Sequence, residues 1–191
     1  MSDFTLDYQH VHTAASYAAW TVVLAASAVA ATIDARSRKI PNLLTFPLFL
    51  FGLVFSAATG HFSTSIQGAL LLFIPYLLLF IFAGGGAGDA KLMGAIGAWI
   101  GFAAAIPVLV AVSLSGGLLA IGYALLRRRM ASVSTNLRAM ALGASLFALY
   151  RTRLVQAQEL LPDQEKMLTM PYGISIFVGT ALAAGWVLVC H

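Results

Sequence analysis

Two aspartates, Asp34 and Asp89, occupy places where an ionisable side chain is costly. The chain of 191 residues has only seven acidic residues, and these two adjoin strongly apolar segments. Ionisable groups beside the hydrocarbon of a membrane are usually paired or functional. Two carboxylates in one partly dehydrated place cannot both ionise freely, so one keeps its proton and the pair offers an acid and a base. Such a pair titrates as a unit and can activate water against a peptide carbonyl.

Each aspartate also has a purely structural interpretation. Asp34 is followed closely by Arg36 and suits a solvated, salt-bridged helix end. Asp89 lies in the glycine-rich stretch GGGAGDAK, just before an apolar run, where a carboxylate is a good N-cap favoured by the helix dipole. The glycines of this stretch suit a tight turn. The case for chemistry therefore depends on the two aspartates lying at the same depth of one bundle.

The composition predicts a polytopic membrane protein of the all-α class. Hydrophobic residues make up 60% of the chain and charged residues 9%, whereas soluble domains carry about 25% charged residues. The apolar runs do not alternate with polar residues as the strands of a membrane barrel do. The one cysteine, Cys190, can form neither a disulfide within the chain nor a CxxC zinc site, so we expect no metal or cofactor. The acidic N-terminal residues indicate a retained first span, not a signal peptide.

Membrane-spanning segments follow from the lengths of the apolar runs. A helix needs roughly 20 apolar residues to cross the hydrocarbon. Four segments are long enough and bounded by polar residues, glycine or proline: 14–33, 41–59, 65–83 and 171–190. The region 92–126 lacks charged side chains, but it is too long for one span and short for two.

The distribution of positive charge resolves this region. If 92–126 crosses twice, all eleven Lys and Arg residues lie on one side, as the positive-inside rule favours. A turn near Gly101 to Pro107 then gives spans over about 90–104 and 106–126. We therefore predict a single membrane domain, residues 1–191, with six transmembrane helices and both termini periplasmic. Both aspartates then lie at the cytoplasmic boundary, where they can meet.

The segment 127–170 is the only sizeable soluble part in this topology. It mixes apolar positions with arginines. It could form a helix on the membrane with its basic residues toward anionic headgroups. A partly ordered cytoplasmic loop is equally consistent with this pattern.

Three motifs resemble those of the prepilin peptidases, membrane aspartic proteases of the GxGD type. GAGD, from Gly86 to Asp89, and the following AKL resemble the family's GxGDxKL segment. Asp34 followed by IPNLLT, at 40–45, resembles its DxxxxxIPNxLT segment. MPYG, at 170–173, and Gly179 resemble its final span. The motifs occur in the family's order over most of the chain.

This resemblance implies a function and a mechanism. Asp34 and Asp89 would be the catalytic dyad, and the protein would cleave a type IV pilin precursor after a short basic leader, at the cytoplasmic face of the bacterial inner membrane. Longer members carry an insertion with paired CxxC motifs that is associated with methylating the new N-terminus. The sequence has neither feature, so we expect cleavage without zinc or methyl transfer. In this it resembles the short form that serves Flp-type (tight-adherence) pili.

Five further residues are candidates for supporting or substrate-binding roles. Gly86 and Gly88 would let a substrate backbone approach and leave amides free to bind a carbonyl. Lys91 could act on an aspartate or hold the substrate, or it could be a snorkelling anchor. Asn42 could hydrogen-bond near the first aspartate. Pro41 suits the first turn of the second span.

Two other classes of function remain open from the sequence. The aspartates could carry protons or cations in a small transporter, or the chain could be a non-catalytic pilus-assembly subunit. The peptidase interpretation implies two partners, a prepilin and the lipid bilayer, and no nucleic acid.

Overall fold

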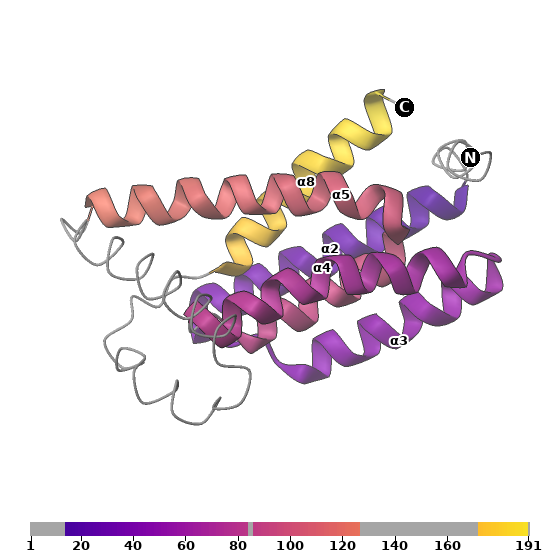
Figure 1. Cartoon of the computed structure of the whole chain (residues 1–191), viewed down its shortest axis with the longest axis horizontal. Coiled ribbons are helices and arrows are strands. Elements are labelled where there is room, and N and C mark those ends of the chain that lie inside the picture. The colour runs from indigo at the N-terminus through magenta and orange to yellow at the C-terminus, as the bar shows by residue number, and fades with distance from the viewer. Residues whose placement is uncertain (1–13, 84–85, 127–171, 191) are drawn as a thin grey trace, which may run out of the picture.

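The computed structural model describes residues 14–83, 86–126 and 172–190 (Figure 1). Over these ranges the chain is helical and contains no strand, which confirms the all-α prediction. The elements in chain order are α2 (Ala14–Ser37), α3 (Asn42–Ala58), α4 (Phe62–Ala83), α5 (Ala87–Leu126) and α8 (Tyr172–Cys190). Their bounds lie close to those of the expected spans. The segment 127–170, with its expected surface helix or loop, lies outside the described residues.

Four of the helices are long and apolar enough to cross a membrane. They are found at Ala15–Ser37, Phe62–Ile81, Ala87–Gly122 and Tyr172–Val189, while α3 is a shorter apolar helix of 17 residues. Large hydrophobic side chains also cover the outside of the bundle, as lipid-facing surfaces require. The protein is therefore a multi-pass membrane protein. The division into six spans and the side on which the termini lie stay predictions.

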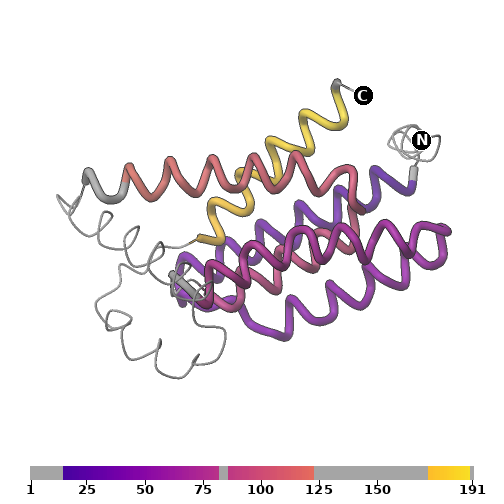
Figure 2. Tube along the Cα trace, viewed as in Figure 1, coloured from indigo at the N-terminus to yellow at the C-terminus, as the bar shows by residue number. Residues whose placement is uncertain are grey.

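Helix α5 reverses its direction at Gly101, as the chain trace shows (Figure 2). Gly101 has φ 72° and ψ −179°, a backbone conformation that is essentially restricted to glycine. The break divides α5 into a first arm, 87–100, and a second arm, 102–126. It falls at the start of the predicted turn, and Pro107 lies within the second arm.

The first arm of α5 forms the centre of the bundle. Its side chains Leu92, Met93 and Ile96 are fully buried, and α5 packs against all four other described helices. The close approach to α4 depends on small residues, because a Cβ on Gly68 would lie 2.5 Å from the carbonyl carbon of Gly101. Small residues that let backbones approach are typical of helix contacts in membranes.

Hydrogen bonds in the interior of the bundle, two buried and one partly buried, join α3 and α4 to the same arm. The hydroxyls of Ser56 and Ser65 both donate to the carbonyl oxygen of Ala98, at 3.0 and 2.5 Å. The indole of Trp99 donates to the carbonyl oxygen of Leu48 at 2.8 Å. Because buried polar groups are costly without partners, these bonds restrict how α3 and α4 can sit on α5. The start of α5 is thereby held in a fixed place.

The conformation of Gly101 gives a first testable prediction. Replacing Gly101 with alanine should destabilise the protein by about 1–3 kcal/mol, because an L-residue is strained at this φ and ψ. The free energy of unfolding can be measured in mixed detergent and SDS. Gly117→Ala is the control, since Gly117 lies in α5 with open space around its Cβ position and should be neutral or slightly stabilising. Equal stability of Gly101→Ala and wild type would contradict the reversal.

Candidate active site

Asp34 lies in the last turns of α2, with only 6% of its surface exposed. Its Oδ2 accepts a hydrogen bond of 2.8 Å from the backbone amide of Gly173, in the first turn of α8. The helix continues past Asp34 to Ser37, beyond the end predicted from the apolar run, and Arg38 then adopts a left-handed φ of 52°. Asp34 is therefore a buried carboxylate with a backbone donor, which argues against the solvated helix end that the sequence left open.

Asp89 lies in the first turn of α5 and is 9% exposed. Its backbone amide donates to the carbonyl oxygen of Gly86 at 3.1 Å, and its carboxylate accepts the backbone amide of Gly86. Gly86 thus occupies the capping position, and Asp89 is the third residue of the helix. The side chain of Asp89 reaches back to the capping residue, as the acid of a capping box does. The expected N-cap role of Asp89 is wrong in position, although its carboxylate does help to close the helix end.

The two carboxylates lie close enough for their charges to interact. They reach this place from the end of α2 and the start of α5, which lie at the same end of the bundle as the start of α8, on the left of Figure 1. Each carboxylate accepts one backbone amide. A carboxylate offers about four acceptor positions, so both retain capacity for a water molecule. This arrangement suits general acid–base chemistry on a bound water.

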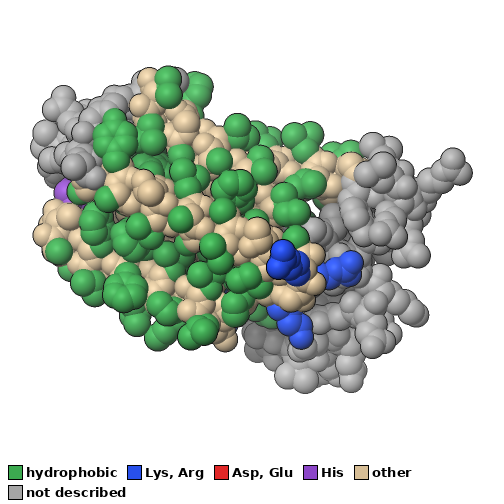
Figure 3. All heavy atoms as spheres, turned by 180° about the vertical axis from the view of Figure 1, so that it is seen from behind, with side chains coloured by type: hydrophobic (Ala, Val, Ile, Leu, Met, Phe, Trp, Pro, Cys, Tyr) green, Lys and Arg blue, Asp and Glu red, His purple; other side chains and the backbone are tan. Residues whose placement is uncertain are grey.

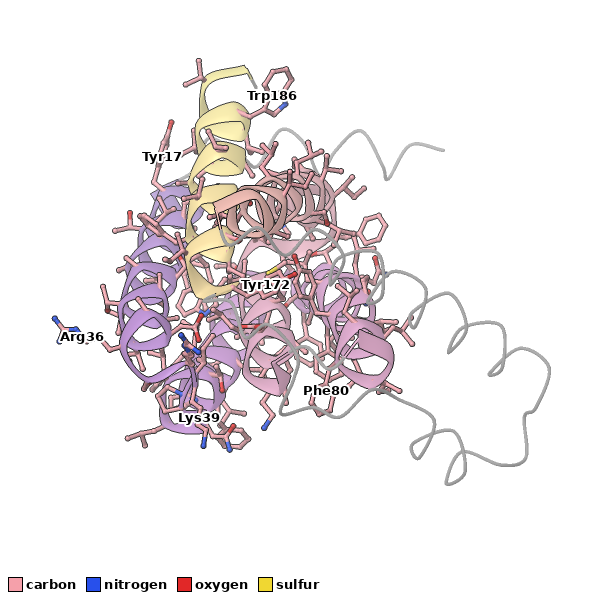
Figure 4. All side chains as sticks on the ribbon, turned by 90° about the vertical axis from the view of Figure 1, so that its left-hand side faces the viewer. Tyr17, Arg36, Lys39, Phe80, Tyr172 and Trp186 are labelled. Carbon is pink, nitrogen blue, oxygen red and sulfur yellow. The ribbon has the colours of Figure 1, made fainter. Side chains whose placement is uncertain are left out.

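Two tyrosines complete the surroundings of Asp89, and neither was predicted as a site residue. Tyr76 of α4 is buried and shares a hydrogen bond with the side chain of Ser113. Tyr76 and Tyr172 both lie within range of the charge of Asp89. In Figure 4, Tyr172 lies at the start of α8, whereas Arg36 points outward from the bundle. Nothing in the apolar sequence around Tyr76 distinguishes it from a packing residue. Tyr172 lies in the MPYG motif, whose resemblance to the family's final span is the signal in the sequence that could have found it.

Lys91 and Asn42 form a contact of their own. The Nζ of Lys91 donates to Oδ1 of Asn42 at 2.8 Å, and both side chains are exposed. This bond joins the start of α5 to the start of α3. The sequence did not suggest that Lys91 and Asn42 are partners. Pro41 takes the capping position just before α3, one residue earlier than predicted.

The two glycines of the motif contact the protein itself. A Cβ on Gly88 would lie 2.9 Å from Cβ of Ile40, and a Cβ on Gly86 would lie 2.6 Å from Oδ2 of Asp89. A side chain at position 88 would therefore collide with Ile40, whereas a side chain at position 86 would displace the carboxylate of Asp89. The expected approach of a substrate backbone to Gly86 and Gly88 stays a prediction. In the described part of the chain, no group of three or more His, Cys, Asp or Glu side chains is placed to hold a metal ion.

Comparisons with known proteins connect this site to a family. A sequence model of the type IV leader peptidase family matches residues 21–121, a range that includes both aspartates and excludes α8. A Neisseria gonorrhoeae protein named prepilin leader peptidase/N-methyltransferase is 39% identical over 97 residues, which are 46% of this chain and 34% of that protein. Proteins of the same name are 36% identical over 104 residues in Aeromonas hydrophila and 35% over 127 residues in Escherichia coli K12.

The matches cover 50% of this chain and 36% of the Aeromonas protein, and 60% of this chain and 55% of the Escherichia coli protein. The chain therefore spans about a third to a half of the length of these relatives. No solved structure matches the chain.

The bond between Lys91 and Asn42 can be tested with a double-mutant cycle. Lys91→Ala and Asn42→Ala should show a coupling of about 0.5–1 kcal/mol in the free energy of unfolding, because an exposed hydrogen bond contributes at the low end of the range for hydrogen bonds. The exchanged pair, Asn42→Lys with Lys91→Asn, should recover part of the loss. Lys39→Ala combined with Asn42→Ala is the control and should be additive. Additive effects of the Lys91 and Asn42 substitutions, without recovery on exchange, would show that the bond does not form.

Proposed function

The chain belongs to the type IV leader peptidase family, and from this we propose that it is a membrane aspartic endopeptidase that removes the leader from type IV prepilins. The observation that carries the proposal is the placement of Asp34 at the end of α2 and Asp89 at the start of α5, as two buried carboxylates near enough for their charges to interact. The relatives named above are prepilin leader peptidases. Because cleavage needs one acid and one base, a pair of aspartates that share one proton is sufficient for both roles.

The reaction can be written with the two aspartates and one water. One aspartate, as a carboxylate, takes a proton from the water while the water oxygen bonds to the peptide carbonyl carbon. The other aspartate, which is protonated, gives its proton to the carbonyl oxygen. The diol then collapses: the leaving nitrogen takes the proton from the first aspartate and the C–N bond breaks. The second aspartate recovers its proton from a diol hydroxyl, so the pair returns to its starting state.

The proposed substrate is a prepilin with a basic leader and an adjoining apolar helix. The leader would stay in the cytoplasm while the helix lies in the bilayer beside the enzyme. The described cations of the chain, Arg36, Arg38, Lys39 and Lys91, follow the two aspartates closely in the sequence, and blue side chains gather at one end in Figure 3. By the positive-inside rule this supports a site at the cytoplasmic face of the bacterial inner membrane. The resemblance to the short form favours Flp-type pilins as substrates.

We further propose that both arms of α5 cross the membrane, which gives six spans. The reversal at Gly101 supports this topology, because it returns the end of α5 to the side on which α5 began. The start of α2 and the end of α8 lie away from the aspartates, toward the right of Figure 1. Both termini would then be periplasmic.

The test is cleavage of a prepilin substrate by the purified protein in detergent. Asp34→Asn and Asp89→Asn should each lower kcat by about 10²–10⁴-fold, the range of general acid–base catalysis. Asp7→Asn makes the same chemical change at a residue outside both the described part of the chain and the family match, and it should cleave as wild type does. A chelator should leave the rate unchanged, because both proton transfers are assigned to aspartates.

Other outcomes would point to other functions. Cleavage at the wild-type rate by either single variant of the pair would exclude the dyad. A folded wild-type protein that does not cleave would favour the non-catalytic assembly subunit. Proton or cation movement that follows a gradient and requires both aspartates would favour a transporter.

A further inference from the structure

The first turn of α8 donates a hydrogen bond to Asp34 and lies within range of the charge of Asp89, although it lies beyond the residues matched by the family. Gly173 donates its backbone amide to Oδ2 of Asp34 at 2.8 Å, and both residues are buried. Its neighbour Tyr172 lies within range of the charge of Asp89. The family match ends at residue 121, so this contact adds an element that the match does not contain.

The amide of Gly173 is well suited to hold a carboxylate. The amides of the first turn of a helix have no partner within the helix, and the N-terminal end of a helix favours negative charge. A bond from such an amide to a carboxylate is charge-assisted and stronger than a neutral one. The bond therefore fixes the orientation of the Asp34 carboxylate from outside its own helix.

There is no room for a side chain at this contact. A Cβ on Gly173 would lie 2.9 Å from Cβ of Asp34, 3.1 Å from its Oδ2 and 3.2 Å from Cα of Ala31. An alanine would have to push α8 or the carboxylate away. Glycine at position 173 therefore sets the distance between α8 and Asp34 as well as donating the bond.

The second arm of α5 holds this turn of α8 in place. The hydroxyl of Ser115 donates to the carbonyl oxygen of Ser175 at 2.9 Å, and a Cβ on Gly116 would lie 3.5 Å from the ring of Tyr172. Further along, Gly179 packs directly against the backbone of Val112. The turn that carries Gly173 is thus supported by buried contacts on the side away from Asp34, as a positioning group requires.

We propose that Gly173 is a positioning residue of the active site, which orients the carboxylate of Asp34 through its backbone amide while leaving no space for a side chain. The inference rests on the proposed function, since it assigns a role in the same reaction. Gly173 does not touch the substrate in this role. Its replacement should therefore change the rate of the chemical step and leave substrate binding as it is.

The kinetic test compares two alanine variants of α8. Gly173→Ala should lower kcat by about 10–100-fold with KM unchanged, because small displacements of a catalytic group have effects of this size. Gly185→Ala is the matched control, because its Cβ position is open, and it should retain the wild-type kcat. Unchanged kcat in Gly173→Ala, or a loss that appears only in KM, would overturn the proposal.

A spectroscopic test reports on the bond without any need for activity. In protein labelled with ¹⁵N-glycine, the resonance that Gly173→Ala removes identifies the Gly173 amide. Asp34→Asn should move this amide proton upfield, because a neutral acceptor replaces a carboxylate, whereas the Gly185 amide should not move. An unmoved Gly173 resonance would overturn the proposal even if cleavage requires both aspartates. Conversely, if Asp34→Asn shifts the Gly173 resonance but the wild-type protein does not cleave prepilin, the bond is confirmed and the proposed function is refuted.

Discussion

Two carboxylates must be kept inside an apolar bundle, close enough for their charges to interact, and the rest of the structure depends on meeting this constraint. Asp34 and Asp89 are both nearly buried, and a buried carboxylate is costly unless donors or partners stabilise it. Here backbone amides supply the donors, from Gly173 for Asp34 and from Gly86 for Asp89. Both donors are glycines whose Cβ would collide with the aspartate that they hold.

Close backbone packing carries this arrangement through the bundle. Lipid is as apolar as the side chains, so helices in a membrane gain little from hydrophobic burial against one another and depend on shape and hydrogen bonds. Contacts of Gly68 with the first arm of α5, and of Gly179 with the second arm, provide that shape. The reversal at Gly101 places the second arm where it supports α8, and α8 in turn reaches Asp34. A glycine far from the aspartates thereby contributes to their geometry.

The sequence predicted the helices, and it predicted that both aspartates lie at one end of the bundle, because both follow from local patterns. Apolar runs define helices, and the positive residues beside Asp34 and Asp89 predict that both aspartates lie on the same side of the membrane. The contacts that hold the aspartates could not be predicted in this way. Gly173 is remote in sequence from Asp34, and Tyr76 lies in an apolar run like any packing residue. Likewise, the helix α2 extends past its apolar run to Ser37, because backbone hydrogen bonding does not stop where hydropathy falls.

In the proposed mechanism, Asp34 and Asp89 act together on one water molecule. The most direct measurement is an experimental structure of the wild-type protein in lipid, at a resolution that shows ordered water. We expect one water molecule within about 3 Å of a carboxylate oxygen of each aspartate, with the Gly173 amide still bonded to Asp34. Carboxylates too far apart for a single water to reach both, with and without a bound prepilin peptide, would contradict the shared-water mechanism.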